Sequence, residues 1–187
     1  MPDSMNRALQ EIIDDFSLDD AVEVKKIESK INHDVKAVEY FLQNKLSEVP
    51  GSTNYISSIH FACTSEDINN VSYAMMIRDG VQVIRSSLEE IGSKFRTNSH
   101  QWCDSAMLSH THGQPATPTT MGKEFANFLH RLEQQMELLE GIQYRAKMNG
   151  AVGNFNAHNL AYPKINWKTF SKKLINGGVT KKTTKNK

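Results

Sequence analysis

The sequence predicts an all-α protein built from long helices. Two stretches, residues 64–95 and 125–142, repeat apolar residues at helical spacing, and almost no stretch alternates as strands do. A pattern of about 30 residues exceeds a usual globular helix and predicts packing in a bundle or a coiled-coil-like pair. The spacings of four and three in the second stretch favour left-handed bundle packing.

Shorter elements precede the first long stretch. Residues 4–16 repeat apolar side chains on one helical face, and Ser17-Leu18-Asp19-Asp20 is a helix-start signature with acids in the first turn. Two further apolar stripes end at Pro50-Gly51-Ser52, which is typical of a boundary. These breaks divide the chain into residues 1–52, residues 53–170 and a Lys-rich tail, residues 171–187, which is expected to be disordered.

Composition predicts a soluble chain with neither a nucleic-acid nor a membrane partner. The net charge of +1 lacks the basic excess that phosphate binders usually carry. No apolar run of about 18 residues predicts a membrane span, and the first residues lack a signal-peptide pattern. Cys63 and Cys103 show neither disulfide nor metal spacing, which favours a reducing cytoplasmic location.

Side chains that can transfer protons or form hydrogen bonds are concentrated in Ser109–Pro118. This stretch holds two histidines, three hydroxyls and an amide. Its two prolines fix φ and bias the residues before them away from the helix, and Gly113 can take a positive φ. We therefore expect a stiff, non-helical loop, followed by a helix that Thr117 or Thr119 caps.

His112 is the first candidate for catalysis, because histidine titrates near neutrality and suits a general acid or base. The alternative is a loop histidine that hydrogen-bonds the backbone. A zinc site combining His110 and His112 with His100 or Cys103 lacks a CxxC or HExxH pattern, so no metal is expected.

Three further short polar segments lie at breaks between predicted helices. They are Asn32-His33-Asp34, Thr64-Ser65 and the glycine-rich residues 149–156. Helix ends expose unpaired N–H groups, so converging helix starts predict an anion site for carboxylates or phosphate. The alternatives are a buried His33 paired with Asp34 or a carbonyl, and a Thr64-Ser65 pair that only caps its helix.

Three stretches carry a family resemblance: His60–Asn70 with Thr-Ser-x-Asp, Thr111–Pro118 with Thr-x-x-Gln-Pro-Ala, and Lys147–Asn154 with Asn-Gly-Ala-Val-Gly-Asn. Together with Asn32–Tyr40, they resemble the adenylosuccinate lyase family of the fumarase/aspartase superfamily. The resemblance implies a long-helix bundle, in which residues 1–52 end a first helical domain and residues 53–170 open the central helical domain.

The resemblance also implies a C–N lyase reaction of purine biosynthesis that needs no cofactor or metal. The family eliminates fumarate from adenylosuccinate, giving AMP, and from SAICAR, giving AICAR. A base removes a proton from the succinyl Cβ, and an acid protonates the departing nitrogen. Electrostatic stabilisation of the doubly charged intermediate would be the largest catalytic contribution.

Residue roles follow from the same resemblance. It gives His112 the role of general acid. It implies that His33 lies near the substrate phosphate and that Thr64 and Ser65 hold the succinyl or fumaryl carboxylate. The full set of implied substrate-binding residues is Asn32, His33, Asp34, Thr64, Ser65 and Thr111.

The sequence also departs from the family pattern, and the chain is expected to be truncated at both ends. An N-terminal Arg-Tyr contact and the loop Ser-Ser-x-Met-Pro-x-Lys-x-Asn-Pro, whose serine is the family's base, have no counterpart in these 187 residues. Position 110 holds His where the family commonly has Arg. The family forms tetramers whose sites draw on three subunits. We therefore expect a homo-oligomer, and a chain that alone is inactive or nearly so.

Two other functions remain open on the sequence. One is a non-catalytic helical assembly module, a remnant of the enzyme that oligomerises with itself or with the full enzyme. The other is a different lyase of the superfamily, such as one acting on argininosuccinate.

Overall fold

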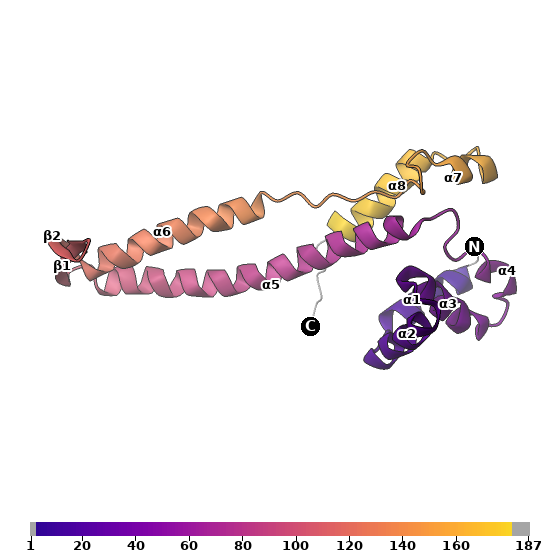
Figure 1. Cartoon of the computed structure of the whole chain (residues 1–187), viewed down its shortest axis with the longest axis horizontal. Helices are drawn as coiled ribbons and strands as arrows, with labels where there is room; N and C mark the ends of the chain where they lie inside the picture. Colours follow the sequence, from indigo (N-terminus) through magenta and orange to yellow (C-terminus); the bar gives the residue numbers. More distant parts are fainter. Residues whose placement is uncertain (1–2, 181–187) are drawn as a thin grey trace. The chain divides into compact units, whose positions relative to one another are not determined.

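The computed structural model describes residues 3–180 and is predominantly helical (Figure 1). The elements are α1 (Asp3–Asp14), α2 (Leu18–Ile31), α3 (Asp34–Ser47), α4 (Thr53–Ile56), α5 (Ser65–Gln101), β1 (Ala106–Thr111), β2 (Gln114–Thr120), α6 (Met121–Glu140), α7 (Asn156–Ala161), α8 (Trp167–Ile175) and the π-helical η1 (Asn176–Thr180). The predicted all-α class is confirmed, with one short hairpin added. None of the helices in residues 3–180 is both long and apolar enough to cross a membrane.

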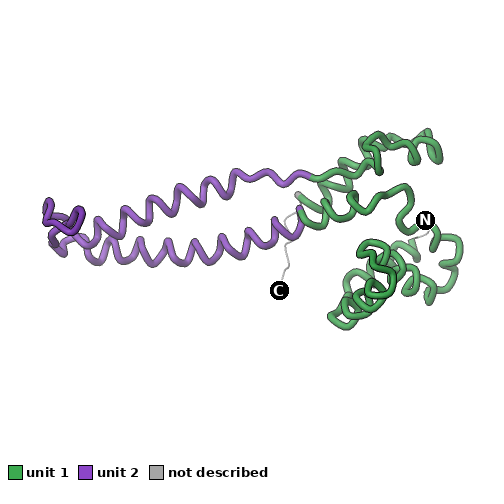
Figure 2. The backbone as a smooth tube through the Cα atoms, viewed as in Figure 1, with its two compact units in different colours: residues 1–73, 146–187 green, residues 74–145 purple. Residues whose placement is uncertain are grey.

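The chain forms two compact units (Figure 2). Unit 1 combines residues 1–73 with residues 146–187, and unit 2 is residues 74–145. The division falls within α5, so one helix contributes to both units. The sequence predicts a domain boundary between residues 52 and 53. The two compact units divide the chain elsewhere, and the boundary between the family domains stays a prediction.

Helices α1 to α3 form where the apolar stripes and the helix-start signature predicted them. The Ser17 hydroxyl accepts the Asp20 N–H, while the Asp20 carboxylate accepts the Ser17 N–H at 2.9 Å, which completes a capping box for α2. Phe41 and Leu46 of α3 are almost completely buried, and Phe16 meets the Phe41 ring edge-on with centroids 5.8 Å apart. The apolar stripes of these helices therefore form a small core.

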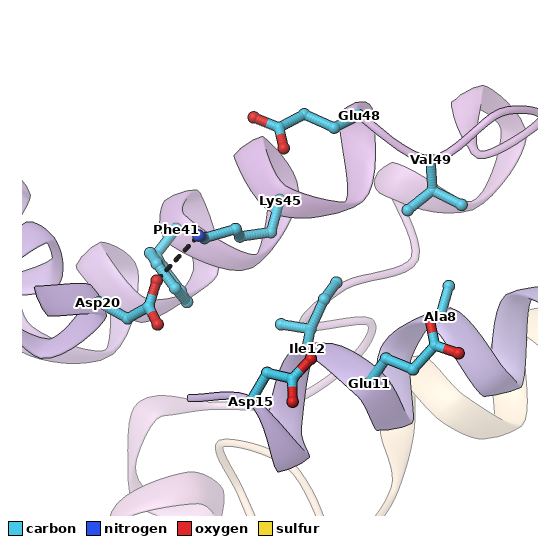
Figure 3. Close-up of a pocket in the computed structure, with 9 residues that line it drawn as sticks. All are labelled: Ala8, Glu11, Ile12, Asp15, Asp20, Phe41, Lys45, Glu48 and Val49. Atoms are coloured by element: carbon cyan, nitrogen blue, oxygen red, sulfur yellow. Dashed lines mark ion pairs between the residues drawn. The ribbon is translucent and has the colours of Figure 1, made fainter. Parts of the chain in front are cut away.

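A cavity of about 300 Å³ opens among α1, α2 and α3 (Figure 3). At its edge, Lys45 Nζ lies 2.8 Å from Asp20 Oδ1, and the hydrogen bond from Lys45 is the main reason that the pKa of Asp20 is lowered to about 2. Within residues 3–180, no cluster of three or more His, Cys, Asp or Glu side chains is arranged to hold a metal ion.

Unit 2 is a pair of antiparallel helices joined by the hairpin. Phe95 of α5 packs against Phe125 and Phe128 of α6, with ring centroids 6.0 and 6.4 Å apart. Arg85 of α5 pairs with Glu140 of α6 at 2.9 Å. Gly122 allows a close approach, since a Cβ there would lie 2.6 Å from the Cα of Cys103. The predicted pairing of two long helices is confirmed.

The prediction of disorder in residues 171–187 is wrong for residues 171–180. Helix α8 extends to Ile175, and η1 covers Asn176–Thr180. The physical reason is burial, since Trp167, Ser171 and Val179 are each less than 10% exposed. The Trp167 indole also donates to the Tyr162 carbonyl at 3.2 Å. The prediction for residues 181–187 falls outside the described part of the chain.

Candidate active site

The stretch around His112 is a two-stranded antiparallel hairpin, which corrects the predicted loop. Thr111 pairs with Gln114, so the turn consists of His112 and Gly113 alone. Both have positive φ, 51° and 75°, which is the pattern of a type I′ turn. The stretch is non-helical, as expected.

Two further details of the hairpin were not expected. A register irregularity lies between Leu108 and His110, and the Ser109 hydroxyl donates to the Thr117 carbonyl. Helix α6 is capped by Thr120, whose hydroxyl accepts the Lys123 N–H at 3.1 Å, and not by Thr117 or Thr119.

His112 lies at the tip of this hairpin. Its side chain and that of Thr111 are exposed, and within residues 3–180 neither forms a hydrogen bond. The alternative of a histidine bonded to the backbone is therefore not observed. A non-glycine residue in the left-handed region is strained, and such strain often accompanies function.

Asn32, His33 and Asp34 form the junction between α2 and α3. Asn32 ends α2 with φ of 53° and donates its backbone N–H to the Glu28 carbonyl at 2.8 Å. His33 is the N-cap of α3, and its Nδ1 accepts the Lys36 N–H at 3.2 Å. Asp34 Oδ1 accepts the Val35 N–H, a hydrogen bond that lowers the pKa of Asp34.

The His33 side chain is 49% exposed, so the burial expected in the alternative is wrong, although its Nδ1 does lie 3.5 Å from Asp34 Oδ1. Because Nδ1 accepts a hydrogen bond in this arrangement, a neutral His33 carries its proton on Nε2. Nε2 is therefore the ring atom that can donate to a ligand. A long hydrogen bond of 3.5 Å from Asn69 of α5 to Asp34 connects this junction to the first turns of α5.

Ser65 begins α5, Thr64 directly precedes it, and Asp67 lies in the first turn. Asp67 is 1% exposed, and its Oδ2 accepts the backbone N–H of Thr64 at 3.1 Å. This contact is the second half of a capping box. Within residues 3–180, neither the Thr64 nor the Ser65 hydroxyl forms a hydrogen bond, so both can serve a ligand.

Asp67 also holds the glycine-rich segment against the start of α5. Oδ1 accepts Lys147 Nζ at 2.9 Å and the Asn149 N–H at 3.0 Å, and Oδ2 accepts the Gly150 N–H at 3.0 Å. The Asn70 amide accepts the Lys147 backbone N–H and donates to the Lys147 carbonyl. We call residues 64–67 with 147–150 the Asp67 junction.

The charge of the Asp67 junction is balanced internally. Burial raises the pKa of Asp67, but the hydrogen bonds from Lys147, Thr64 and Asn149 outweigh it, and the pKa is lowered overall. The converging N–H groups that were predicted to bind a substrate anion therefore bind the carboxylate of Asp67. The hydroxyls of Thr64 and Ser65 take no part in this network of hydrogen bonds within residues 3–180.

Two buried polar atoms near this junction have no hydrogen-bond partner within the described residues, Asn149 Oδ1 and His158 Nδ1. His158 is 2% exposed and is enclosed by the rings of Phe61, Phe155 and Trp167. This packing fixes the turn in which Gly150 lies, since a Cβ on Gly150 would be 3.6 Å from His158 Cε1.

The structure thus brings together part of the predicted site. The Asn32-His33-Asp34 junction, the Thr64-Ser65 pair and the glycine-rich segment all belong to unit 1. Thr111 and His112 belong to unit 2. Asp67 and Lys147 were missed, although the Thr64-to-Asp67 spacing is that of a capping box and could have indicated Asp67. No local pattern indicates its pairing with Lys147.

Comparison with known proteins agrees with the resemblance. The chain is 50% identical over 161 residues to the adenylosuccinate lyase of Legionella pneumophila strain Philadelphia 1, covering 86% of this chain and 35% of the relative. It is 46% identical over 168 residues to that of Escherichia coli K12, covering 89% of this chain and 37% of the relative. The chain therefore spans little more than a third of the length of these curated relatives.

Solved structures show the same fold at low identity. Fumarate lyase from Mesorhizobium sp. BNC1 matches 96% of this chain and 40% of its own, with a TM-score of 0.76 and 17% identity. The β-carboxy-cis,cis-muconate cycloisomerase of Acinetobacter calcoaceticus sp. ADP1 matches 96% of this chain and 41% of its own, with a TM-score of 0.75 and 16% identity. The model of the lyase family matches residues 2–186, and the chain therefore belongs to this family.

Proposed function

We propose that this chain supplies part of the active site of an adenylosuccinate lyase. The reaction is β-elimination of fumarate from adenylosuccinate, giving AMP, and from SAICAR, giving AICAR. The observation that carries the proposal is the identity of 46 to 50% to curated adenylosuccinate lyases across most of this chain. It favours this reaction over that of another superfamily lyase, such as one acting on argininosuccinate.

His112 is the general acid in this proposal, and Thr111 lies next to it at the end of β1. The two-residue turn exposes the imidazole and leaves both ring nitrogens free of intramolecular hydrogen bonds in the described chain. A general acid must reach the departing nitrogen of the substrate, and an exposed imidazole on a stiff hairpin suits that task.

The remaining candidates bind substrate. Asn32, His33 and Asp34 contact the nucleotide, with His33 Nε2 as the donor to phosphate. The Thr64 and Ser65 hydroxyls hold the carboxylate that becomes part of fumarate. The buried Asp67 supports these two residues by fixing the backbone of Thr64.

The experiment is active-site complementation. This chain would be mixed with a full-length Escherichia coli adenylosuccinate lyase whose acid histidine is replaced by Ala and whose serine loop is intact. We expect these 187 residues alone to release no fumarate from adenylosuccinate, because they contain no counterpart of the serine loop, and the mixture to regain activity. Fumarate release would be followed by absorbance.

The matched control is the same mixture with the His112→Ala chain, which should be slower by about 10²–10⁴-fold. Equal recovery with both chains would contradict the role of His112. Activity of the wild-type chain alone would mean that a group within these 187 residues acts as the base. A parallel assay with argininosuccinate as the substrate would distinguish the two reactions, since fumarate release from it alone would favour the rival lyase.

A second function, a non-catalytic helical assembly module, is favoured by exposed apolar side chains in unit 2. Met76, Val83 and Leu138 are 66 to 70% exposed, more than a helix pair in water usually leaves uncovered. We propose that these faces assemble with other copies into a homotetramer. Light scattering after size exclusion tests this assembly, and a monomer at all concentrations would contradict it.

We also propose a cytoplasmic location. Cys63 is half-buried, Cys103 is exposed, and both are free thiols. Free cysteines are the usual state in a reducing compartment. Fractionation of the source cells with an antibody against the chain would test this location, and recovery from the culture medium would contradict it.

A further inference from the structure

The charges of this chain are strongly segregated. Residues 141–187 contain ten Lys or Arg and no Asp or Glu, whereas residues 1–140 contain twelve Lys or Arg and all 21 acidic residues. The overall charge of +1 hides this asymmetry. A uniformly basic segment raises the local concentration of anions at its surface.

Part of this segment lines a concave surface in unit 1. The concavity has a volume of about 400 Å³ and lies between the glycine-rich segment and one face of α8. Lys168 and Lys172 of α8 border it, and Phe155, Met148 and Ile175 provide apolar walls. We call this surface the α8 basic pocket. Among the described residues neither Lys168 nor Lys172 forms an ion pair, while Lys147 is paired with Asp67.

Without an anion, Lys168 lies at an unfavourable position and close to a like charge, whereas Lys172 lies in the last turn of α8, where the macrodipole favours a cation. Lys168 lies in the first turn of α8, where the helix macrodipole disfavours a cation, and this turn holds no acidic residue. Lys168 and Lys172 are also four residues apart on one helix face, a spacing at which like charges repel. A ligand anion between the two ammonium groups would remove both penalties.

We propose that the α8 basic pocket binds an organic phosphate, meaning a phosphate group on a flat or apolar body. The phosphate lies between the ammonium groups of Lys168 and Lys172. The apolar body packs against Phe155, Met148 and Ile175. None of these residues has a role in the proposed lyase reaction, so the inference goes beyond it.

A small phosphate fits this surface better than a nucleic acid does. Single-stranded nucleic acid is usually bound along an extended groove where successive bases stack on several aromatic side chains. Among residues 3–180, Phe155 is the one aromatic residue that lines this pocket. Of the three lysines that line this concavity, Lys147 is paired with Asp67, and the other two with one ring match one phosphate and one small body.

Isothermal titration calorimetry with phenyl phosphate tests the proposal on the whole chain. We expect one ligand per chain, tighter binding than inorganic phosphate shows, and weaker binding at high salt. The double variant Lys168→Gln, Lys172→Gln should weaken binding of phenyl phosphate by at least about tenfold, since hydrogen bonds to charged groups are lost. Both positions are exposed, so the variant should fold, which circular dichroism would verify.

The matched control is Lys164→Gln, Lys173→Gln, which removes the same charge from exposed positions that do not line the pocket. It should change the affinity less than about twofold, as expected for screened surface charges. An equal loss in both double variants would overturn the proposal in favour of diffuse charge attraction. Preferential binding of a single-stranded oligonucleotide, or no binding of phenyl phosphate at millimolar concentration, would also overturn it.

Discussion

The Asp67 junction and the His112 turn are both parts of the candidate site, but they are built in opposite ways. In the junction, each oxygen of a buried carboxylate accepts two hydrogen bonds, from Lys147 and Asn149 on one side and from Thr64 and Gly150 on the other. At the turn, His112 is exposed and its side chain has no hydrogen bond within the described residues.

This difference shows which part of the site is fixed by the chain itself. The proposed substrate-binding residues Thr64 and Ser65 lie beside a buried carboxylate, Asp67, which accepts the Thr64 N–H and pairs with the partly exposed Lys147. His112 lies in a two-residue turn, and within residues 3–180 no hydrogen bond holds its exposed imidazole. We expect substitutions of Asp67 and Gly150 to change mainly stability and substitution of His112 to change mainly activity.

The largest effect is expected for Asp67→Asn. The substitution leaves the Lys147 ammonium without its carboxylate and places an amide N–H against backbone donors. Because Lys147 stays partly hydrated, the cost is that of hydrogen bonds to one buried charged group, about 1.5–3 kcal/mol of unfolding free energy. Urea denaturation measures the loss. The control is Glu66→Gln, an exposed first-turn neighbour, which should lose less than about 1 kcal/mol.

The same carboxylate predicts a dependence on pH. Because the pKa of Asp67 is lower in the folded chain, its contribution is present above the unfolded value of about 4 and is lost as the pH falls below it. Urea denaturation between neutral pH and the acid range should show this decrease for the wild type. A variant Asp67→Asn with the same acid sensitivity would mean that other carboxylates account for the decrease.

A smaller effect is expected for Gly150→Ala. Gly150 has φ of 81°, and a side chain in the left-handed region costs about 1–2 kcal/mol. The nearest atom to the new Cβ would be 3.6 Å away, an ordinary contact, so the loss comes from the backbone. Gly80→Ala in α5 is the control, and it should gain about 0.5–1 kcal/mol because Gly80 is helical with open space beside it. Thermal or urea unfolding that shows equal effects at both glycines would contradict this.

The smallest stability effect is expected at the turn. His112→Gly removes the strain of a non-glycine residue at φ of 51° and should raise the unfolding free energy by up to about 1 kcal/mol. The same variant should lose its ability to complement in the fumarate assay. A clear loss of stability would mean that the His112 side chain is held by contacts, and the contrast with the Asp67 junction would fail.

Local patterns predicted most of the helical fold. The apolar spacing gave the long helices, and Ser17 with Asp20 indicated the capping box that begins α2. The prolines of residues 109–118 predicted a non-helical segment, but not the pairing of β1 with β2, which depends on positive φ at His112. Lysine-rich composition hid the helical spacing of Trp167, Phe170 and Leu174 in α8.

The candidate site was predictable only in part. The resemblance assigned His112, Thr64 and Ser65, because motifs preserve residue types at fixed spacing. The partners of Asp67 could not be predicted, since contacts between residues 80 positions apart leave no periodic signal. The α8 basic pocket was missed because the mean charge of the chain averages an acidic and a basic segment.

Unit 1 consists of two segments of the chain, and all of unit 2 lies between them in the sequence. The ribosome therefore synthesises unit 2 before the second segment of unit 1. Asp67 leaves the peptidyl transferase centre 80 residues before Lys147, and at roughly 5–20 residues per second this is an interval of roughly 4–16 s. During that interval the carboxylate has no cation to pair with, while the helices between them are completed. Residues 64–67 can therefore join residues 147–150 only after all of unit 2 has been synthesised.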